Sequence, residues 1–140
     1  MKRVLTRDRQ RSPNRTGATT VEFALVAPIF FLILIVSFEF SRLNVILHTA
    51  DNAAYEAARI AMVPGATAAE AVNEANRIMN IAGARGTTVT VNPATLGPNT
   101  DQITVTVDIP MGQNGLITPR FTGGRTISAT STLKAERIGQ

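Results

Sequence analysis

The sequence predicts a membrane-anchored α+β protein. We expect a long N-terminal helix, transmembrane at first and amphipathic later, then a second short helix and a small three-stranded antiparallel sheet. Three observations predict this fold. Residues 18–38 form an apolar run with one charge, residues 68–82 have apolar side chains at helical spacing, and three later stretches alternate apolar with polar residues. Helices followed by half-polar strands favour helices packed on one face of an antiparallel sheet.

The apolar run, residues 18–38, has the length of a membrane span. At about 1.5 Å per residue it covers roughly 31 Å, the thickness of a hydrocarbon core. Pro28 lies within it and is expected to kink the helix, because proline removes one backbone hydrogen bond. A buried soluble helix is the alternative, but a small domain has no core wide enough to surround it. A cleaved secretory signal also fits poorly, because the run is long and no A-x-A-like site follows it closely.

Charge is distributed very unevenly. Residues 1–17 carry six basic side chains and one acidic one, so this leader has a net charge of +5 and the rest of the chain −1, out of +4 in total. A basic arm can indicate nucleic-acid binding, but an arm directly before a span is better explained by the positive-inside rule. We therefore expect a single-pass protein of the inner (cytoplasmic) membrane, with a cytoplasmic leader, a periplasmic or extracellular C-terminal domain and no nucleic-acid partner.

The first helix is expected to begin near residues 16–18 and to continue to about Met62, so that residues 39–63 form an amphipathic extension. Small and apolar residues recur along it at alternating spacings of four and three: Leu43, Leu47, Ala50, Ala54, Ala57 and Ala61. Alanine lets another helix approach closely. The pattern leaves open whether this stripe packs on the chain's own domain or on another subunit. Glu39 and Arg42 are expected to form a solvated pair within the helix.

Residues 64–140 are expected to form the exported α+β domain. Pro64-Gly65 ends the first helix, Thr67 and Glu70 form a capping box, and Gly83 follows the second helix. Strands are expected over residues 87–91, 103–109 and 127–135. The predicted core consists of Ile103, Val105, Val107, Val72, Ile78, Met79, Ile127 and Leu133. The opposite face of the middle strand, with Thr104, Thr106 and Asp108, is expected to stay wet or to meet a partner.

Residue types that carry catalysis are scarce. The chain has one histidine, His48, and no cysteine, so neither a zinc cluster nor a Cys–His nucleophile pair is available. Its glycine-containing turns lack the lysine and Ser/Thr of a phosphate loop. We therefore expect no enzyme activity, no metal or cofactor, and no small-molecule substrate.

The most informative segment is residues 15–28. The basic leader ends in Gly17, the small residue Ala18 follows, and Glu22 stands five positions after the glycine in an otherwise apolar run. This resembles the class III signal of type IV pilin precursors. The Glu22-Phe23 pair and Pro28 make it most similar to the TadE-like minor pseudopilins of the tight-adherence (Flp-type) pilus system. The resemblance extends to Met62 and returns weakly over residues 125–137.

The resemblance implies that a prepilin peptidase cleaves the Gly17–Ala18 bond at the cytoplasmic face of the membrane. Cleavage would leave a mature chain of 123 residues (140 − 17). Glu22, with Phe23 beside it, would act in assembly by pairing with the new Ala18 ammonium of a neighbouring subunit. The alternative is that Glu22 is an interfacial acid tolerated near the positive end of the helix dipole.

These features imply a minor pseudopilin-like structural subunit of a tight-adherence pilus or secretion apparatus. Its expected partners are membrane lipid, a prepilin peptidase, and other pilin or pseudopilin subunits with their machinery. The alternative is a single-span envelope interaction module that is neither processed nor assembled into a pilus. The mature N-terminus distinguishes the two.

Overall fold

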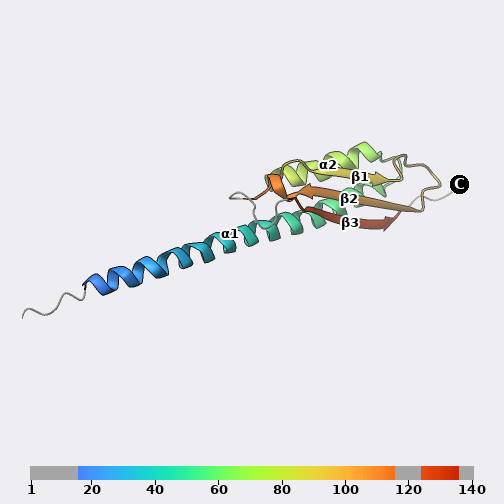
Figure 1. Ribbon diagram of the computed structural model, residues 1–140. Helices are drawn as coiled ribbons and strands as arrows, with labels where there is room; N and C mark the ends of the chain where they lie inside the picture. Colours follow the sequence, from blue (N-terminus) through green and yellow to red (C-terminus); the bar gives the residue numbers. More distant parts are fainter. Residues whose placement is uncertain (1–15, 116–123, 136–140) are drawn as a thin grey trace, which may run out of the picture. The chain divides into compact units, whose positions relative to one another are not determined.

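The computed structural model describes residues 16–115 and 124–135 (Figure 1). The leader up to Arg15, the linker residues 116–123 and the C-terminal Glu136-Arg137 lie outside the described residues. The elements are α1 (Thr16–Ala61), α2 (Ala68–Ile81), β1 (Thr88–Asn92), β2 (Gln102–Pro110), a short 3-10 helix η1 (Met111–Gln113) and β3 (Thr126–Lys134). The predicted α+β fold, with a long helix, a short helix and a three-stranded antiparallel sheet, is confirmed. The chain divides into two compact units, residues 1–35 and 36–140.

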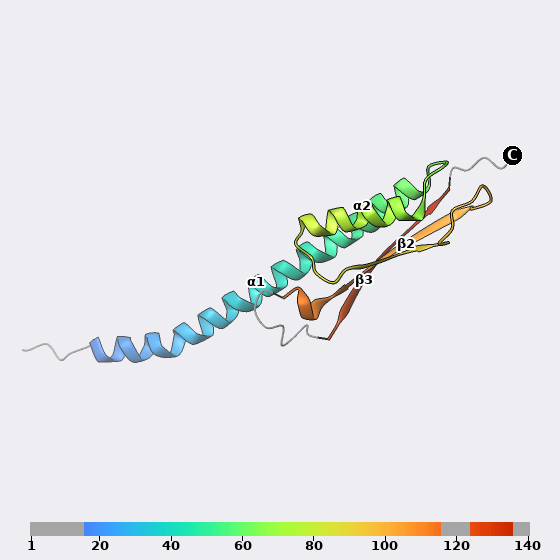
Figure 2. The same ribbon diagram turned by 90° about the horizontal axis from the view of Figure 1, so that it is seen from above.

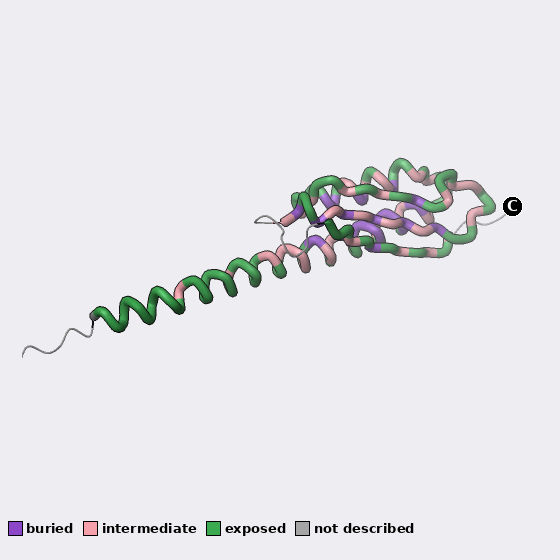
Figure 3. Tube along the Cα trace, viewed as in Figure 1, coloured by how far each residue is buried: buried purple, intermediate pink, exposed green. Residues whose placement is uncertain are grey.

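Helix α1 is continuous over 46 residues and contains Pro28 without interruption; a kink at Pro28 stays a prediction. Among the described residues, it is the one helix long and apolar enough to cross a membrane, and its most apolar window has a mean hydropathy of 2.6 with none of it buried. Apart from the half-buried Leu34, the large apolar side chains between Val21 and Phe40 are more than two-fifths exposed, and Figure 3 shows most of this part of α1 as exposed. Side chains of this kind suit the lipid phase, as expected for a single-pass anchor.

In the unit formed by residues 36–140, α2 and the second half of α1 lie on one face of the sheet (Figure 2). The strand order is β1-β2-β3, and both pairs are antiparallel. Strand β2 alternates strictly: Ile103, Val105, Val107 and Ile109 are fully buried, and the residues between them are half-buried. The predicted strand faces are therefore confirmed.

The other face of the sheet is polar and half-exposed. Its hydroxyl groups pair across the strands, with 3.0 Å between the Thr104 and Thr132 oxygens and 3.3 Å between those of Thr106 and Thr130. Ser128 donates a hydrogen bond to the Asp108 carboxylate. Cross-strand hydroxyl contacts of this kind stabilise a sheet modestly.

The second half of α1 packs through alanine. Its fully buried residues are Ile46, Ala50, Ala53, Ala54, Ala57, Ala58 and Ala61. Helix α2 contributes the buried Ala71 and Ala75 to the same core cluster. Because a methyl group is small, α1 and the elements packed against it can approach one another closely along these residues. For Ala50 to Ala61 this resolves the open alternative: the stripe packs on the chain's own domain, whereas Leu43 and Leu47 are only half-buried.

Helix α2 begins and ends with the predicted caps. The Glu70 backbone N–H donates to the Thr67 hydroxyl at 3.3 Å, and the Thr67 N–H donates to the Glu70 carboxylate at 2.9 Å. At the other end Gly83 has a φ of +65°, a conformation that glycine adopts without steric cost. Local cap chemistry therefore sets both ends of α2.

The predicted core is largely confirmed. Ile103, Val105, Val107, Ile78 and Met79 are buried, and Val72 and Leu133 pack partly buried against them. Ile127 is a correction, because it is only half-buried and outside the cluster. It lies near the start of β3, opposite Ile109, and no described strand pairs with the outer side of β3 to cover it.

Val105→Asp tests the assigned inner face of β2. Because Val105 is fully buried, an unpaired carboxylate there should lower the free energy of unfolding by about 3–5 kcal/mol. Thermal unfolding of the detergent-solubilised chain, followed by far-UV circular dichroism, measures this effect. Thr104→Asp, on the half-exposed face, is the control and should change stability little. Equal melting temperatures for Val105→Asp and the wild type would show that the face is wrongly assigned.

Ala57→Leu tests the alanine contact. Ala57 has no exposed surface, so a larger side chain should force the packed elements apart and cost about 1–3 kcal/mol. Ala69→Leu is the matched control, because Ala69 is exposed on α2. The same unfolding assay should show a loss for the first variant alone; a loss of similar size in both would contradict tight packing at Ala57.

Candidate processing and assembly segment

Gly17 and Ala18 lie in the first turn of α1, and both are exposed. A Cβ atom built on Gly17 would meet nothing within 4 Å, and its φ is not positive. Neither space nor backbone conformation therefore requires glycine at this position. Glycine costs about 1 kcal/mol relative to alanine in the interior of a helix, but Gly17 lies in the first turn, so the fold tolerates this glycine without requiring it.

The bond between these two residues lies where a helix is easiest to unwind. The first four N–H groups of a helix have no partner within the helix, and the first turn of α1 contains no acidic side chain. Terminal turns open at the lowest free energy. A peptidase that needs an extended backbone would have to unwind only this turn.

Glu22 lies in the second turn of α1, between Val21 and Phe23, which are 62% and 70% exposed. Within the described part of the chain, its carboxylate makes no hydrogen bond or ion pair. The helix dipole acts mainly within the first turn, so it stabilises Glu22 less than the sequence indicated. The carboxylate is thus exposed on an apolar surface and available to a partner from outside the described residues.

Arg42 has a role that the sequence did not indicate. Its guanidinium donates hydrogen bonds to the Ala82 and Gly83 carbonyl oxygens, at 2.7 Å and 3.1 Å. These carbonyls belong to the C-terminus of α2, where backbone acceptors lack helical partners and a cation is favourable. Arg42 therefore joins α1 to the end of α2. Its pairing with Glu39 stays a prediction.

Asn114 is the buried polar residue of this region, with 3% of its surface exposed. It accepts from the Arg85 backbone N–H and donates to the Arg85 and Pro110 carbonyls, all at 2.8 Å. The Arg85 backbone is therefore fixed, while its side chain makes no hydrogen bond or ion pair to the described residues. No periodic pattern marks a loop asparagine, so sequence reasoning missed both residues.

A small cavity lies beside Arg42, Arg85 and Asn114. It has a volume of about 270 Å³ and is lined by Arg42, Gly83, Arg85, Gln113, Asn114 and Gly115. Among the described residues that line it, two are cationic and none is acidic. The cavity therefore favours an anion.

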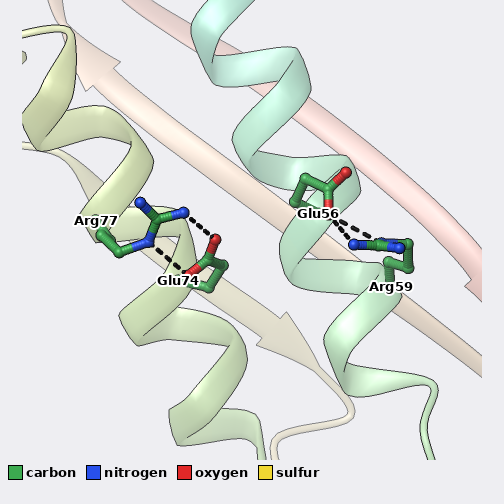
Figure 4. Close-up of polar contacts among 4 residues, drawn as sticks. All are labelled: Glu56, Arg59, Glu74 and Arg77. Carbon is green, nitrogen blue, oxygen red and sulfur yellow. Dashed lines mark hydrogen bonds and ion pairs between the residues drawn. The ribbon is translucent and has the colours of Figure 1, made fainter.

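A larger open groove, about 650 Å³, separates α1 from α2. Each wall carries a Glu-Arg pair three residues apart: Glu56 with Arg59 at 2.8 Å, and Glu74 with Arg77 at 2.6 Å (Figure 4). The hydrogen bond from Arg77 lowers the pKa of Glu74, and the same contact raises the pKa of Arg77. Both pairs lie within their own helix and are partly exposed, so they contribute little to stability.

No group of three His, Cys, Asp or Glu among the described residues could hold a metal ion. His48 is exposed on α1. The arrangement offers a helix with an exposed carboxylate, a basic cavity and a polar groove.

The chain was compared with known families and proteins. Residues 17–59 match the model of the family described as TadE-like protein, which agrees with the resemblance seen in the sequence. No curated protein and no solved structure gave a match. The matched segment covers most of α1, from Gly17 through the buried alanines to Arg59. Through this helix the chain is similar to TadE-like proteins.

Proposed function

We propose that this chain is a minor pseudopilin-like structural subunit of a tight-adherence pilus or secretion apparatus. A prepilin peptidase cleaves it after Gly17, and α1 holds it in the inner membrane with the C-terminal domain outside. The observation that carries the proposal is that the fold of α1 needs neither Gly17 nor Glu22, and that Glu22 places a carboxylate in an otherwise apolar run.

Cleavage of the Gly17–Ala18 bond would explain the presence of both Gly17 and Glu22. A glycine before the scissile bond lets the backbone extend in a peptidase site. Removal of the leader then creates an ammonium at Ala18 in the same apolar layer as Glu22 of a neighbouring subunit. Opposite charges in a low-dielectric layer attract strongly, so the pairing would form only among processed chains. Processing would thereby control assembly.

The packing of α1 limits where other subunits bind. The buried alanines of its second half are covered by the chain's own domain, so they are not available for intermolecular contacts. Most large apolar side chains between Val21 and Phe40 are exposed. We therefore expect apolar subunit contacts chiefly in this half of α1, which includes Glu22 and Phe23.

The second candidate function is a membrane-tethered envelope interaction module that keeps its leader. The half-exposed polar face of the sheet, with Thr104, Thr106 and Asp108, favours it, because this face offers hydroxyl and carboxylate groups to a partner. The mature N-terminus separates the candidates, because only the pseudopilin loses residues 1–17.

Gly17→Leu tests processing. In cells that carry the tight-adherence machinery, mass spectrometry of the membrane-extracted wild type should show a chain that begins at Ala18. The variant should keep its leader, because a branched side chain hinders extension of the backbone at the scissile bond. Gly97→Leu is the control, because Gly97 also has open space around it and no positive φ, and this variant should be processed normally. An intact leader on the wild type would favour the tethered module.

Glu22→Gln tests assembly. The substitution keeps the size of the side chain and removes its charge, so insertion and cleavage should continue. Assembly should fail, because the Ala18 ammonium of a neighbour would lose its counter-charge, at a cost of about 3–5 kcal/mol. Co-purification with pilus components measures this loss, and Glu39→Gln, at the other end of the apolar segment, should assemble normally. Wild-type assembly by Glu22→Gln would mean that Glu22 is merely an interfacial acid.

A further inference from the structure

We propose that the cavity between Arg42 and Arg85 binds the phosphate of an anionic membrane phospholipid, with Ile81 and Val45 against the lipid boundary beside it. The site would hold the exported domain down on the outer surface of its own membrane. This inference depends on anchoring by α1 and is independent of cleavage or assembly.

The position of Arg42 along α1 brings the cavity to the membrane surface. Helix α1 runs unbroken through this region, and the predicted span ends at Phe38. Arg42 follows four residues later, about 6 Å further along a helix axis. The headgroup layer is roughly 5–8 Å deep on each side of the hydrocarbon, so the Arg42 side chain lies at headgroup level. Its bonds to the Ala82 and Gly83 carbonyls bring the end of α2 to the same level.

The cavity has the chemistry that binds phosphate. Guanidinium groups match phosphate oxygens in charge and in hydrogen-bond geometry. Arg42 uses two of its N–H groups on carbonyls and keeps others, because a guanidinium has five donors. Arg85 has its backbone fixed by Asn114, so less freedom is lost when its side chain engages a ligand.

Arginines at this place require an explanation. Basic residues close to a span are depleted on the exported side, as described by the positive-inside rule. Arg42 and Arg85 nevertheless line one cavity there, and no acidic residue of the described part of the chain lines it with them. An anionic headgroup supplies the missing counter-charge.

Apolar exposure next to the cavity points to lipid rather than to a free anion. Ile81, in the last turn of α2, is 76% exposed, and Val45 on α1 is 49% exposed. Both line the same end of the groove between the helices, together with Ala82, whose carbonyl binds Arg42. Apolar side chains beside basic ones are typical of surfaces that enter the headgroup and acyl boundary.

The first experiment measures lipid binding by the full chain in detergent. Native mass spectrometry with added phosphatidylglycerol gives its dissociation constant, and Arg85→Gln should raise this constant about tenfold, as expected for one lost charge-assisted hydrogen bond. Arg77→Gln is the matched control, because it removes an exposed arginine of α2 outside the cavity, and it should leave the constant unchanged. Equal effects of the two variants, or none, would overturn the proposal.

Displacement of the lipid by inorganic phosphate at similar concentrations would also overturn it, because the site would then bind only the free ion.

The second experiment locates Ile81 in the bilayer. The chain has no cysteine, so Ile81→Cys and Val63→Cys each accept a single fluorophore. Val63 is 53% exposed and follows the end of α1 at Ala61, which is 23 residues beyond Phe38, roughly 35 Å along the helix. In nanodiscs with headgroup-labelled nitroxide lipid, the label at Ile81 should be quenched several-fold more than the label at Val63. Equal quenching would place the end of α2 away from the membrane and refute the proposal.

Discussion

The unit formed by residues 36–140 depends on the close contact that alanine allows along the second half of α1. Ala50, Ala54, Ala57 and Ala61 have no exposed surface, and they share one core with α2 and with the inner face of β2. Larger side chains would separate the layers and open cavities that a domain of this size could not fill. The same helix therefore combines two surfaces along its length: bulky apolar side chains suited to lipid, and methyl groups suited to a packed protein core.

Sequence reasoning succeeded wherever a local signal determines the structure. The capping box at Thr67 and Glu70, the positive φ at Gly83 and the alternation along β2 are all fixed by residues close in sequence, so the elements were predicted to within a residue or two. Sequence reasoning missed hydrogen bonds between residues that are far apart in the chain. Arg42 meets the Ala82 carbonyl 40 positions away, and Asn114 meets Arg85 29 positions away. Ile127 was misplaced for a related reason, since its burial depends on what lies beside an edge strand.

For the processing segment, sequence and structure contribute different evidence. The spacing of Gly17, Ala18 and Glu22 produces the resemblance to pilin precursors, and no contact in the structure could have supplied it. The structure adds that Gly17 meets no steric requirement and that Glu22 has no partner among the described residues. Residues that break a local pattern and serve no internal contact are candidates for a functional role.

The range of the family match has a physical counterpart in the structure. It ends at Arg59, two residues before α1 ends, and thus includes both the exposed apolar half of the helix and most of its buried alanines. The exposed apolar half suits lipid, whereas the alanines require only a closely fitting cover. Helix α2 and the sheet supply that cover here through Ala71, Ala75 and the valines of β2. Many combinations of small and branched side chains would pack equally well against methyl groups. The alanines of α1 therefore place only weak constraints on the sequences of α2 and the sheet.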